Sequence, residues 1–283
     1  MTAALAPWLA RWGLALDGPP PLVRYQGLSD SGQVAFVRRG ETQAVLKLLP
    51  SGGDEARMAA VLAHWDGQGA VRLIDAAPGA VLIERAVPGC DLADVIAAKS
   101  DEAATLAACE VMAALRRPAP ASEAFRTVGD WGRAFERARQ KAIAAGFDAG
   151  LIERAGAAYG ELLASQAAPA LLHGDLHHHN ILCGGARGWL AIDPKGVLGE
   201  PAYETGALLR NPIETPALCA DEAVIAARAR LMADRLGYDL RRILGWAFSQ
   251  WVLACLWAVE DGIAFEPGWL VGPRAAERLF LSA

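Results

Sequence analysis

The residues best suited to chemistry lie in one short stretch, LLHGDLHHHNILCGGARGWLAIDPKG, at positions 171–196. Four of the chain's five histidines lie there, together with Asp175, Asn180 and Asp193. Asn180 follows Asp175 by five positions, and Asp193 follows across an expected hairpin that turns at Gly184-Gly185. Phosphoryl transfer needs such a trio, because a carboxylate must orient and deprotonate the acceptor hydroxyl while oxygen ligands hold Mg²⁺ on the phosphates.

The spacing and the ligand types both favour this interpretation. An interval of five residues from aspartate to asparagine is the one in the kinase catalytic loop, H-R-D-L-x-x-x-N. Mg²⁺ prefers carboxylate and amide oxygens to imidazole, so aspartate and asparagine suit it.

Two other interpretations of the stretch are possible. In one, His173 and His177–His179 bind a catalytic transition metal with Asp175 or Asp193. Its weakness is that side chains of three consecutive residues diverge and cannot all reach one ion. In the other, the stretch is a polar loop with hydrogen-bonded core histidines, which leaves unexplained why two apolar runs each end in an aspartate.

The motif HGDLHHHN followed by IDP resembles the Brenner-type motif of aminoglycoside phosphotransferases and related small-molecule kinases. More narrowly, LLHGDLHHHNIL, GWLAIDPKGVLGEPAYETGALLRNP and LWAVEDG resemble the streptomycin 6-phosphotransferase and hydroxyurea phosphotransferase family. The resemblance covers most of the chain. It implies a two-lobed α+β, protein-kinase-like fold: a nucleotide-binding lobe over residues 1–87, with a small antiparallel sheet and one inserted helix, and a larger, mostly helical lobe over residues 88–283.

The resemblance also implies roles for single residues. Asp175 corresponds to the catalytic aspartate, Asn180 and Asp193 to Mg²⁺ ligands, and His173 to a structural residue that braces the loop. His179 departs from the family pattern, where glycine or an acid is common, and no role is assigned to it.

The nucleotide site has candidates in the first half of the chain. Lys47 lies in the apolar strand AVLKLL, where a kinase of this type holds the α- and β-phosphates of ATP. Its expected carboxylate partner is Glu55, although Asp54 beside it could cap the helix instead, and Met58 stands one turn later, where a glutamate would also fit.

Two further segments are expected to contact ATP. Ser29 and Ser31, in GLSDSGQV, are candidates for the phosphates, but the segment lacks a full G-x-G-x-x-G and could be an ordinary hairpin turn. By resemblance, Glu84, Arg85 and Ala86 form the hinge strand whose backbone would bind adenine.

The acceptor site is expected in the helical lobe. The candidates are Glu200, Glu204, Glu260 and Asp261, with Trp257 and Trp251 as an apolar wall. Carboxylates match the guanidinium groups of streptomycin, whereas hydroxyurea is small and neutral and needs little acidic lining. Each carboxylate could equally be a solvated helix-end charge. Another metabolite hydroxyl, or a kinase-fold relic that binds nucleotide without catalysis, also stays open.

Hydrophobic periodicity predicts the elements. Strands are expected at 22–28, 33–39, 43–50, 70–76 and 80–87, with a helix at 54–65 between the third and fourth. Two short apolar runs, 170–176 and 188–194, flank the Gly184-Gly185 turn. Helices are expected at 91–99, 101–117 with Ser100 as N-cap, 131–145, 148–165, 221–236 and 240–259.

Composition excludes several classes of protein. The net charge is -5 and Lys and Arg form no long runs, so nucleic acid is not an expected partner. Five scattered cysteines fit reduced thiols and a cytoplasmic location. The apolar stretch 243–259 has Ser249 and Gln250 at its centre and is expected to be a buried core helix rather than a membrane span. The N-terminus has no basic region typical of a signal peptide.

Overall fold

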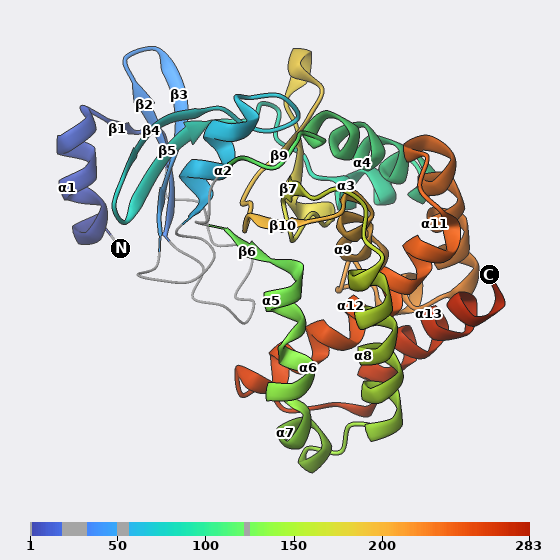
Figure 1. The fold of residues 1–283 in the computed structure, drawn as a ribbon. Coiled ribbons are helices and arrows are strands. Elements are labelled where there is room, and N and C mark those ends of the chain that lie inside the picture. The colour runs from blue at the N-terminus through green and yellow to red at the C-terminus, as the bar shows by residue number, and fades with distance from the viewer. Residues whose placement is uncertain (1, 19–32, 50–56, 122–124) are drawn as a thin grey trace.

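A computed structural model of the chain describes residues 2–18, 33–49, 57–121 and 125–283. It has the two-lobed architecture that the sequence predicts (Figure 1). The N-terminal lobe contains a five-stranded sheet of order β1-β2-β3-β5-β4 in which all neighbouring strands are antiparallel. Its strands are β1 (Ala15–Leu16), β2 (Val34–Arg39), β3 (Thr42–Leu48), β4 (Leu73–Ala77) and β5 (Ala80–Glu84).

Two helices pack on opposite faces of this sheet. Period-two alternation places Leu46 and Lys47 on opposite sides of the central strand β3. Leu46 packs in a cluster with Leu5 of α1 (Thr2–Trp12), a helix that was not predicted. The other face packs with α2 (Met58–Trp65). The predicted strand 22–28 and the start of the predicted helix 54–65 lie outside the described residues.

The C-terminal lobe, which we count from α3 onwards, is mainly helical. Its helices are α3 (Leu92–Ala98), α4 (Asp101–Leu115), α5 (Val128–Gly132), α6 (Ala134–Arg137), α7 (Arg139–Ala144), α8 (Ala149–Ala164), α9 (Thr205–Leu209), α10 (Pro216–Cys219), α11 (Glu222–Leu236), α12 (Leu240–Glu260) and α13 (Val271–Ser282). Ser100 caps α4 as predicted, by accepting a hydrogen bond from the N–H of Ala103.

One helix prediction was wrong in its extent. The segment predicted as a single helix at 131–145 begins earlier, at a capping box between Thr127 and Asp130, and is divided into α5, α6 and α7. The divisions fall at Arg133 and Ala138, which keep right-handed helical dihedral angles. Periodicity alone cannot locate interruptions of this kind, because they barely change which face is apolar.

Helix α12 is the apolar centre of the C-terminal lobe. Within the described part of the chain it is the one helix long and apolar enough to cross a membrane, yet 72% of its apolar window is buried inside the fold. It packs against α8, α9 and α13. Its burial agrees with the prediction of a core helix.

Short strands between α8 and α9 carry the predicted chemical stretch. Strand β10 (Val197–Gly199) pairs with β7 (Ala170–Leu172) and with β6 (Arg126–Thr127), and β8 (Ile181–Cys183) forms a hairpin with β9 (Trp189–Ala191). The hairpin also contacts the N-terminal lobe, where Val71 N–H donates to the carbonyl of Ala191 at 3.0 Å. The hairpin therefore joins the two lobes beside the chemical residues.

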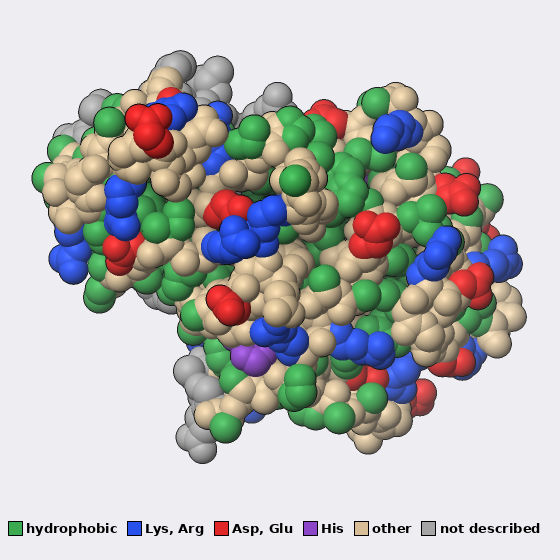
Figure 2. All heavy atoms as spheres, turned by 90° about the horizontal axis from the view of Figure 1, so that it is seen from above, with side chains coloured by type: hydrophobic (Ala, Val, Ile, Leu, Met, Phe, Trp, Pro, Cys, Tyr) green, Lys and Arg blue, Asp and Glu red, His purple; other side chains and the backbone are tan. Residues whose placement is uncertain are grey.

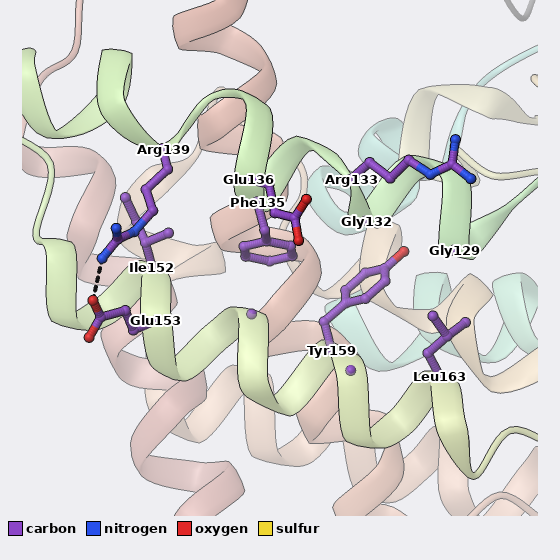
Figure 3. A pocket seen from close by; sticks show the side chains of 12 residues that line it. Gly129, Gly132, Arg133, Phe135, Glu136, Arg139, Ile152, Glu153, Tyr159 and Leu163 are labelled. Carbon is purple, nitrogen blue, oxygen red and sulfur yellow. Dashed lines mark hydrogen bonds and ion pairs between the residues drawn. The ribbon is translucent and has the colours of Figure 1, made fainter.

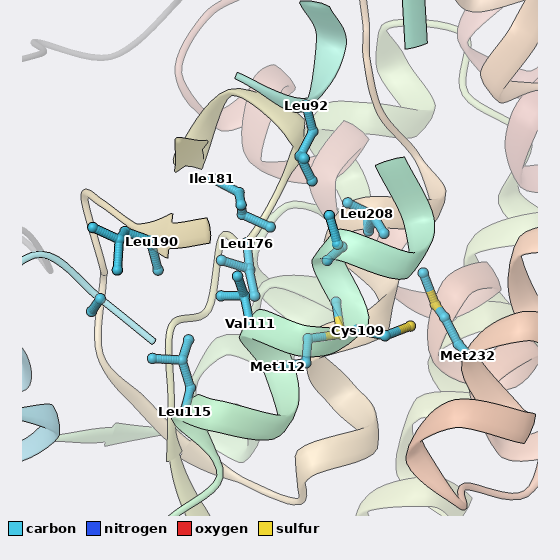
Figure 4. Close-up of a cluster of buried hydrophobic side chains, with 14 of the residues drawn as sticks. Leu92, Cys109, Val111, Met112, Leu115, Leu176, Ile181, Leu190, Leu208 and Met232 are labelled. Atoms are coloured by element: carbon cyan, nitrogen blue, oxygen red, sulfur yellow. The ribbon is translucent and has the colours of Figure 1, made fainter. Parts of the chain in front are cut away.

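A cluster of buried hydrophobic side chains packs around this stretch (Figure 4). Leu176 and Ile181, on either side of the polar loop, are fully buried. They converge with Leu92 of α3 and Val111 of α4. Each such burial is worth roughly 1.5–3 kcal/mol, so the apolar residues of the stretch fix the backbone that carries its polar ones.

Candidate active site

The loop between β7 and β8 brings Asp175 and Asn180 together. The side-chain amide nitrogen of Asn180 donates to the backbone carbonyl of Asp175 at 2.8 Å. The same nitrogen lies 3.2 Å from Nε2 of His177. Because the nitrogen is engaged in this way, the amide oxygen Oδ1 is the atom of Asn180 suited to binding a cation.

His173 is buried and holds two loops together. Its Nε2 lies 2.6 Å from the carbonyl oxygen of Ile192, and its Nδ1 accepts from the N–H of Asp175 at 3.2 Å. Burial lowers the pKa of His173 to about 4, so the ring is neutral at physiological pH. With Nδ1 accepting, the proton is assigned to Nε2, and the imidazole links the loop of Asp175 to that of Asp193.

Lys47 and Asp193 meet between the two lobes. Lys47 Nζ lies 3.0 Å from Asp193 Oδ2, and the lysine side chain is 5% exposed against 35% for the aspartate. Asp193 has a φ of 56°, a left-handed backbone conformation that is uncommon for a residue other than glycine. The sheet thus supplies a buried cation next to the polar loop.

Asp175 lies beside the guanidinium group of Arg210 and the imidazole ring of His177. Arg210 Nη2 lies 3.3 Å from its Oδ1, and His177 Nε2 lies 3.8 Å from its Oδ2. Burial raises the pKa of Asp175, but His177, Arg210 and Lys195 together outweigh it and hold the pKa below its ordinary value. The carboxylate is therefore ionised at neutral pH and able to accept a proton.

Arg210 was not among the predicted site residues. It follows α9 directly, and its side chain is 15% exposed. The sequence signal that could have revealed it is a single arginine at the end of the apolar run TGALL.

Glu204, which was predicted as a substrate residue, is buried and bonded to the protein's own backbone. Its two carboxylate oxygens accept from the backbone N–H groups of His173, at 2.6 Å, and Gly174, at 3.0 Å. It is 6% exposed, and burial raises its pKa to about 7. Glu204 instead fixes the backbone that leads into Asp175.

Glu200, another predicted substrate residue, is likewise engaged by partners inside the protein. It is 2% exposed and forms an ion pair with Arg242 at 2.6 Å. It also accepts hydrogen bonds from the indole of Trp246 and from Ala167 N–H. The sequence could not predict these contacts of Glu200, because its partners lie on α12 and just after α8, more than 30 positions away along the chain.

Three other predicted acceptor residues lie at the end of α12. Glu260 receives two hydrogen bonds from Arg137, at 2.5 and 2.7 Å, while Asp261 is exposed. Trp257 meets the ring of Trp131 edge to face at 5.6 Å. Trp131 in turn lies so close to Gly174 that a Cβ there would come within 2.5 Å of the indole. Trp257 is thus linked to the catalytic loop through Trp131, which the sequence did not single out.

The hinge candidates differ in what they can offer a nucleotide. The N–H of Glu84 donates to Arg72 O at 2.9 Å, and the carboxylate of Glu84 pairs with Arg187. Arg85 pairs with Asp17 at 2.8 Å on the sheet. The N–H and the carboxylate of Glu84 are therefore engaged within the protein. The contacts of the hinge backbone with adenine stay a prediction.

Three predicted nucleotide residues cannot be placed. Ser29, Ser31 and Glu55 lie outside the described residues. Their roles stay predictions.

The three consecutive histidines face different neighbours. Nδ1 of His177 accepts from His179 N–H, and His178 is fully buried. His179 lies between two carboxylates, with Nδ1 2.7 Å from Asp91 and Nε2 3.2 Å from Glu214. Burial lowers the pKa of His179, but the two carboxylates outweigh it and the pKa is raised. His179 thus connects the loop of Asp175 to the start of α3 and to the segment after α9.

A groove elsewhere on the C-terminal lobe shares no lining residue with this site. It lies between α5–α6 and α8 and has a volume of about 400 Å³ (Figure 3). Phe135 and Tyr159 form its apolar part, and Arg139 pairs with Glu153 at its rim.

On the molecular face seen in Figure 2, basic and acidic side chains are interspersed rather than gathered by sign.

Comparison with solved structures establishes the fold. Aminoglycoside phosphotransferase APH(4)-Ia, in a ternary complex with AMP-PNP and hygromycin B, superposes with a TM-score of 0.61 at 14% identity, over 100% of this chain and 99% of the other. LicA in complex with AMP gives 0.65 at 13% identity, over 99% of this chain and 96% of the other. The predicted kinase-like fold is confirmed.

Comparison with curated sequences establishes the family. Streptomycin 3''-kinase of Klebsiella pneumoniae is 33% identical over 90% of this chain and 92% of its own length. Hydroxyurea phosphotransferase of Kitasatospora aureofaciens is 32% identical over 91% of this chain and 73% of its own length. The model of the aminoglycoside/hydroxyurea antibiotic resistance kinases matches residues 23–262. The chain therefore belongs to the aminoglycoside/hydroxyurea antibiotic resistance kinase family.

Proposed function

We propose that the protein transfers the γ-phosphate of ATP to a hydroxyl group of a streptomycin-type aminoglycoside. The observation that carries the proposal is the meeting of Lys47 and Asp193 at 3.0 Å, beside the loop in which Asn180 is bonded to Asp175. Phosphoryl transfer needs a phosphate-binding cation, oxygen ligands for a metal and a base within one site, and these four residues offer that set.

The nucleotide would lie between the lobes. Lys47 would exchange Asp193 for the α- and β-phosphates, and the hinge backbone near Ala86 would hold adenine. The Oδ1 atom of Asn180 and the carboxylate of Asp193 would hold Mg²⁺, and this all-oxygen pair fits that ion. Bound Mg²⁺ supplies charge neutralisation on the phosphates.

Asp175 would act on the acceptor. Its carboxylate is ionised at neutral pH, as its lowered pKa requires, and can orient the acceptor hydroxyl and take its proton. This contribution is on the order of 10²- to 10⁴-fold in rate. The neutral His173 and the carboxylate of Glu204 would keep the base in place by fixing the backbone on its N-terminal side.

The family contains a second candidate activity, phosphorylation of hydroxyurea, and one observation favours it. Two of the four carboxylates expected to bind a cationic acceptor, Glu200 and Glu204, are buried, and a third, Glu260, is paired with Arg137. A neutral acceptor needs no such carboxylates.

A substrate panel separates these possibilities. ATP consumption would be measured with streptomycin, with other aminoglycosides and with hydroxyurea. The proposal expects consumption with streptomycin, and consumption with hydroxyurea alone would replace it by the second candidate. ATP binding without turnover on any acceptor would indicate a nucleotide-binding relic.

The division of labour between lobes is part of the same proposal. Residues 1–87 would serve nucleotide binding and residues 88–283 would carry the catalytic loop and the acceptor site.

A further inference from the structure

Two of the five cysteines, Cys90 and Cys183, face each other across a short backbone pairing. Cys90 lies in the segment that leads from β5 to α3, and Cys183 is the last residue of β8. Asp91 and Leu182, the residues next to them, form an antiparallel bridge. Gly89 N–H donates to the carbonyl of Cys183 at 2.9 Å, and Cys183 N–H donates to the carbonyl of Cys90 at 2.8 Å.

This hydrogen-bond pattern is that of a β-bulge of the glycine type. Gly89 has a φ of 79°, and Gly89 and Cys90 together oppose the single residue Cys183. A side chain at position 89 would be strained, because a Cβ there would come within 2.8 Å of the carbonyl oxygen of Ala86. The sequence Pro-Gly-Cys-Asp therefore holds Cys90 in register with Cys183.

The register suits a covalent link. Opposed residues of an antiparallel pair have Cα atoms about 4.5–5.5 Å apart. Disulfides span Cα separations of roughly 4.4–6.8 Å. Because Cys90 and Cys183 are opposed across this hydrogen-bonded pairing, we expect their Cα atoms to lie within the range that a disulfide spans.

The surroundings separate this pair from the other thiols. Cys90 is exposed and Cys183 is partly exposed, whereas Cys109, Cys219 and Cys255 are buried. Burial and the neighbouring Cys183 thiol raise the pKa of Cys90, so the Cys90 thiol is mostly protonated at neutral pH. Oxidation should therefore proceed through a minor thiolate population and be faster in mildly alkaline solution.

We propose that Cys90 and Cys183 form a dithiol site that a peroxide oxidises to an intramolecular disulfide. One thiolate attacks the peroxide O–O bond to give a sulfenic acid, and with hydrogen peroxide the leaving hydroxide takes up a proton to become water. The second thiol attacks the sulfenic sulfur and releases a second water. Two thiols thus lose two hydrogens, and one peroxide becomes two waters.

The disulfide would tie the segment before α3 to the strand that follows the catalytic loop. Asn180 lies three positions before Cys183, and Asp91, the partner of His179, follows Cys90. The link would close residues 90–183 into a ring and restrict the unfolded chain, so the oxidised protein should melt at a higher temperature. The inference does not depend on the acceptor or on catalysis.

Intact-mass measurement and non-reducing peptide mapping of the full chain, before and after hydrogen peroxide, test the inference. The expected result is a mass lower by two hydrogens, a cross-linked peptide containing Cys90 and Cys183, and reversal by dithiothreitol with a fall in melting temperature. The wild-type map alone decides the matter, even where a variant folds poorly.

Single substitutions sharpen the result. Cys90→Ser and Cys183→Ser should each abolish the mass loss, whereas Cys219→Ser, at a buried thiol, should retain it. Addition of oxygen atoms to Cys90 without loss of two hydrogens, or a disulfide between two chains, would overturn the inference.

Discussion

At the scale of single residues, the loop of Asp175 is held by polar contacts from His173 and from residues beyond its own stretch, Glu204 and Arg210. Asp175 is the centre of these contacts: His173 accepts from its N–H, and Arg210 approaches its carboxylate. The carboxylate of Glu204 accepts hydrogen bonds from the backbone N–H groups of His173 and Gly174, the two residues before Asp175. Each buried hydrogen bond to a charged group is worth roughly 1.5–3 kcal/mol, so the position of Asp175, the proposed base, depends on residues that need not touch a substrate.

Replacement of Arg210 tests its effect on the base. In Arg210→Met, Asp175 loses a neighbour that fixes its orientation, while Lys47 and Asp193 are unaffected. We expect kcat to fall by roughly 10- to 100-fold, from the value of one charged hydrogen bond, with a smaller change in KM for ATP. Steady-state kinetics would show this, with Arg210→Lys, which keeps the charge, as the milder variant. A kcat within twofold of wild type in Arg210→Met would rule out the effect.

Glu204 should make stability depend on pH. Its pKa is about 7 in the folded protein against an ordinary value of 4.5, so the folded state holds the proton more tightly than the unfolded state. The stability that it contributes is complete below about pH 4.5 and is lost as the pH rises through 7. Urea unfolding between pH 5 and 8 should show a fall of up to about 3 kcal/mol from this group.

The matched variant is Glu204→Gln, which cannot titrate. Its unfolding free energy should fall less between pH 5 and 8 than that of the wild-type protein. Equal slopes in the two proteins would show that Glu204 is ionised at its ordinary pKa.

At the scale of elements, helix α9 connects the catalytic loop to the core. Glu204 precedes its first residue and Arg210 follows its last, so both ends of this short helix contact the loop of Asp175. The helix lies against α12, where Gln250 donates to the carbonyl of Tyr203. Gly206 permits this approach, because a Cβ there would come within 2.5 Å of the Gln250 side chain.

Adding one methyl group between α9 and α12 should therefore disturb both stability and catalysis. Gly206→Ala overpacks the contact and should lower the unfolding free energy by about 1–3 kcal/mol, with a loss of kcat. Gly160→Ala is the matched control, because a Cβ at that position of α8 meets nothing within 4 Å. It should stabilise the protein by about 0.4–1 kcal/mol. Destabilisation of both variants to the same extent would show that the effect is not specific to α9.

Sequence patterns predicted the elements better than their ends. The short apolar runs in 33–39 and 80–87 and the cap at Ser100 are local signals, and the corresponding strands and helix form. The breaks at Arg133 and Ala138 leave the apolar face continuous and therefore gave no signal. The roles of Glu200 and Glu204 depend on partners brought together only by folding, and a carboxylate in a sequence does not show whether it will be buried.

At the scale of the whole molecule, the two lobes meet at a charged pair and a shared core. Lys47 of the sheet reaches Asp193 of the C-terminal lobe, and Ala70 forms a bridge with Ala191 nearby. Lys47 is buried on one side of this pair and Asp193 is open on the other, so a nucleotide can compete for the lysine from the solvent side. The resemblance to the kinase family implied that Lys47 and Asp193 belong to one site, but not that they would pair directly.

Lys47→Met should weaken nucleotide binding without unfolding the protein. Methionine preserves most of the buried side-chain volume, and Asp193 is exposed enough to remain hydrated. Calorimetric titration with ATP should show a loss of affinity of at least tenfold, whereas Lys99→Met, at an exposed position after α3, should bind as wild type does. Unchanged ATP affinity in Lys47→Met would place the phosphates elsewhere.

The most direct test of the whole account is ATP-dependent phosphorylation of streptomycin by the wild-type protein and by Asp175→Asn. The account predicts a phosphorylated product with the wild-type protein, and ATP affinity without turnover in the variant, because asparagine cannot accept the proton of the hydroxyl. The expected loss of rate is on the order of 10²- to 10⁴-fold. Normal turnover by Asp175→Asn would contradict the assignment of the base.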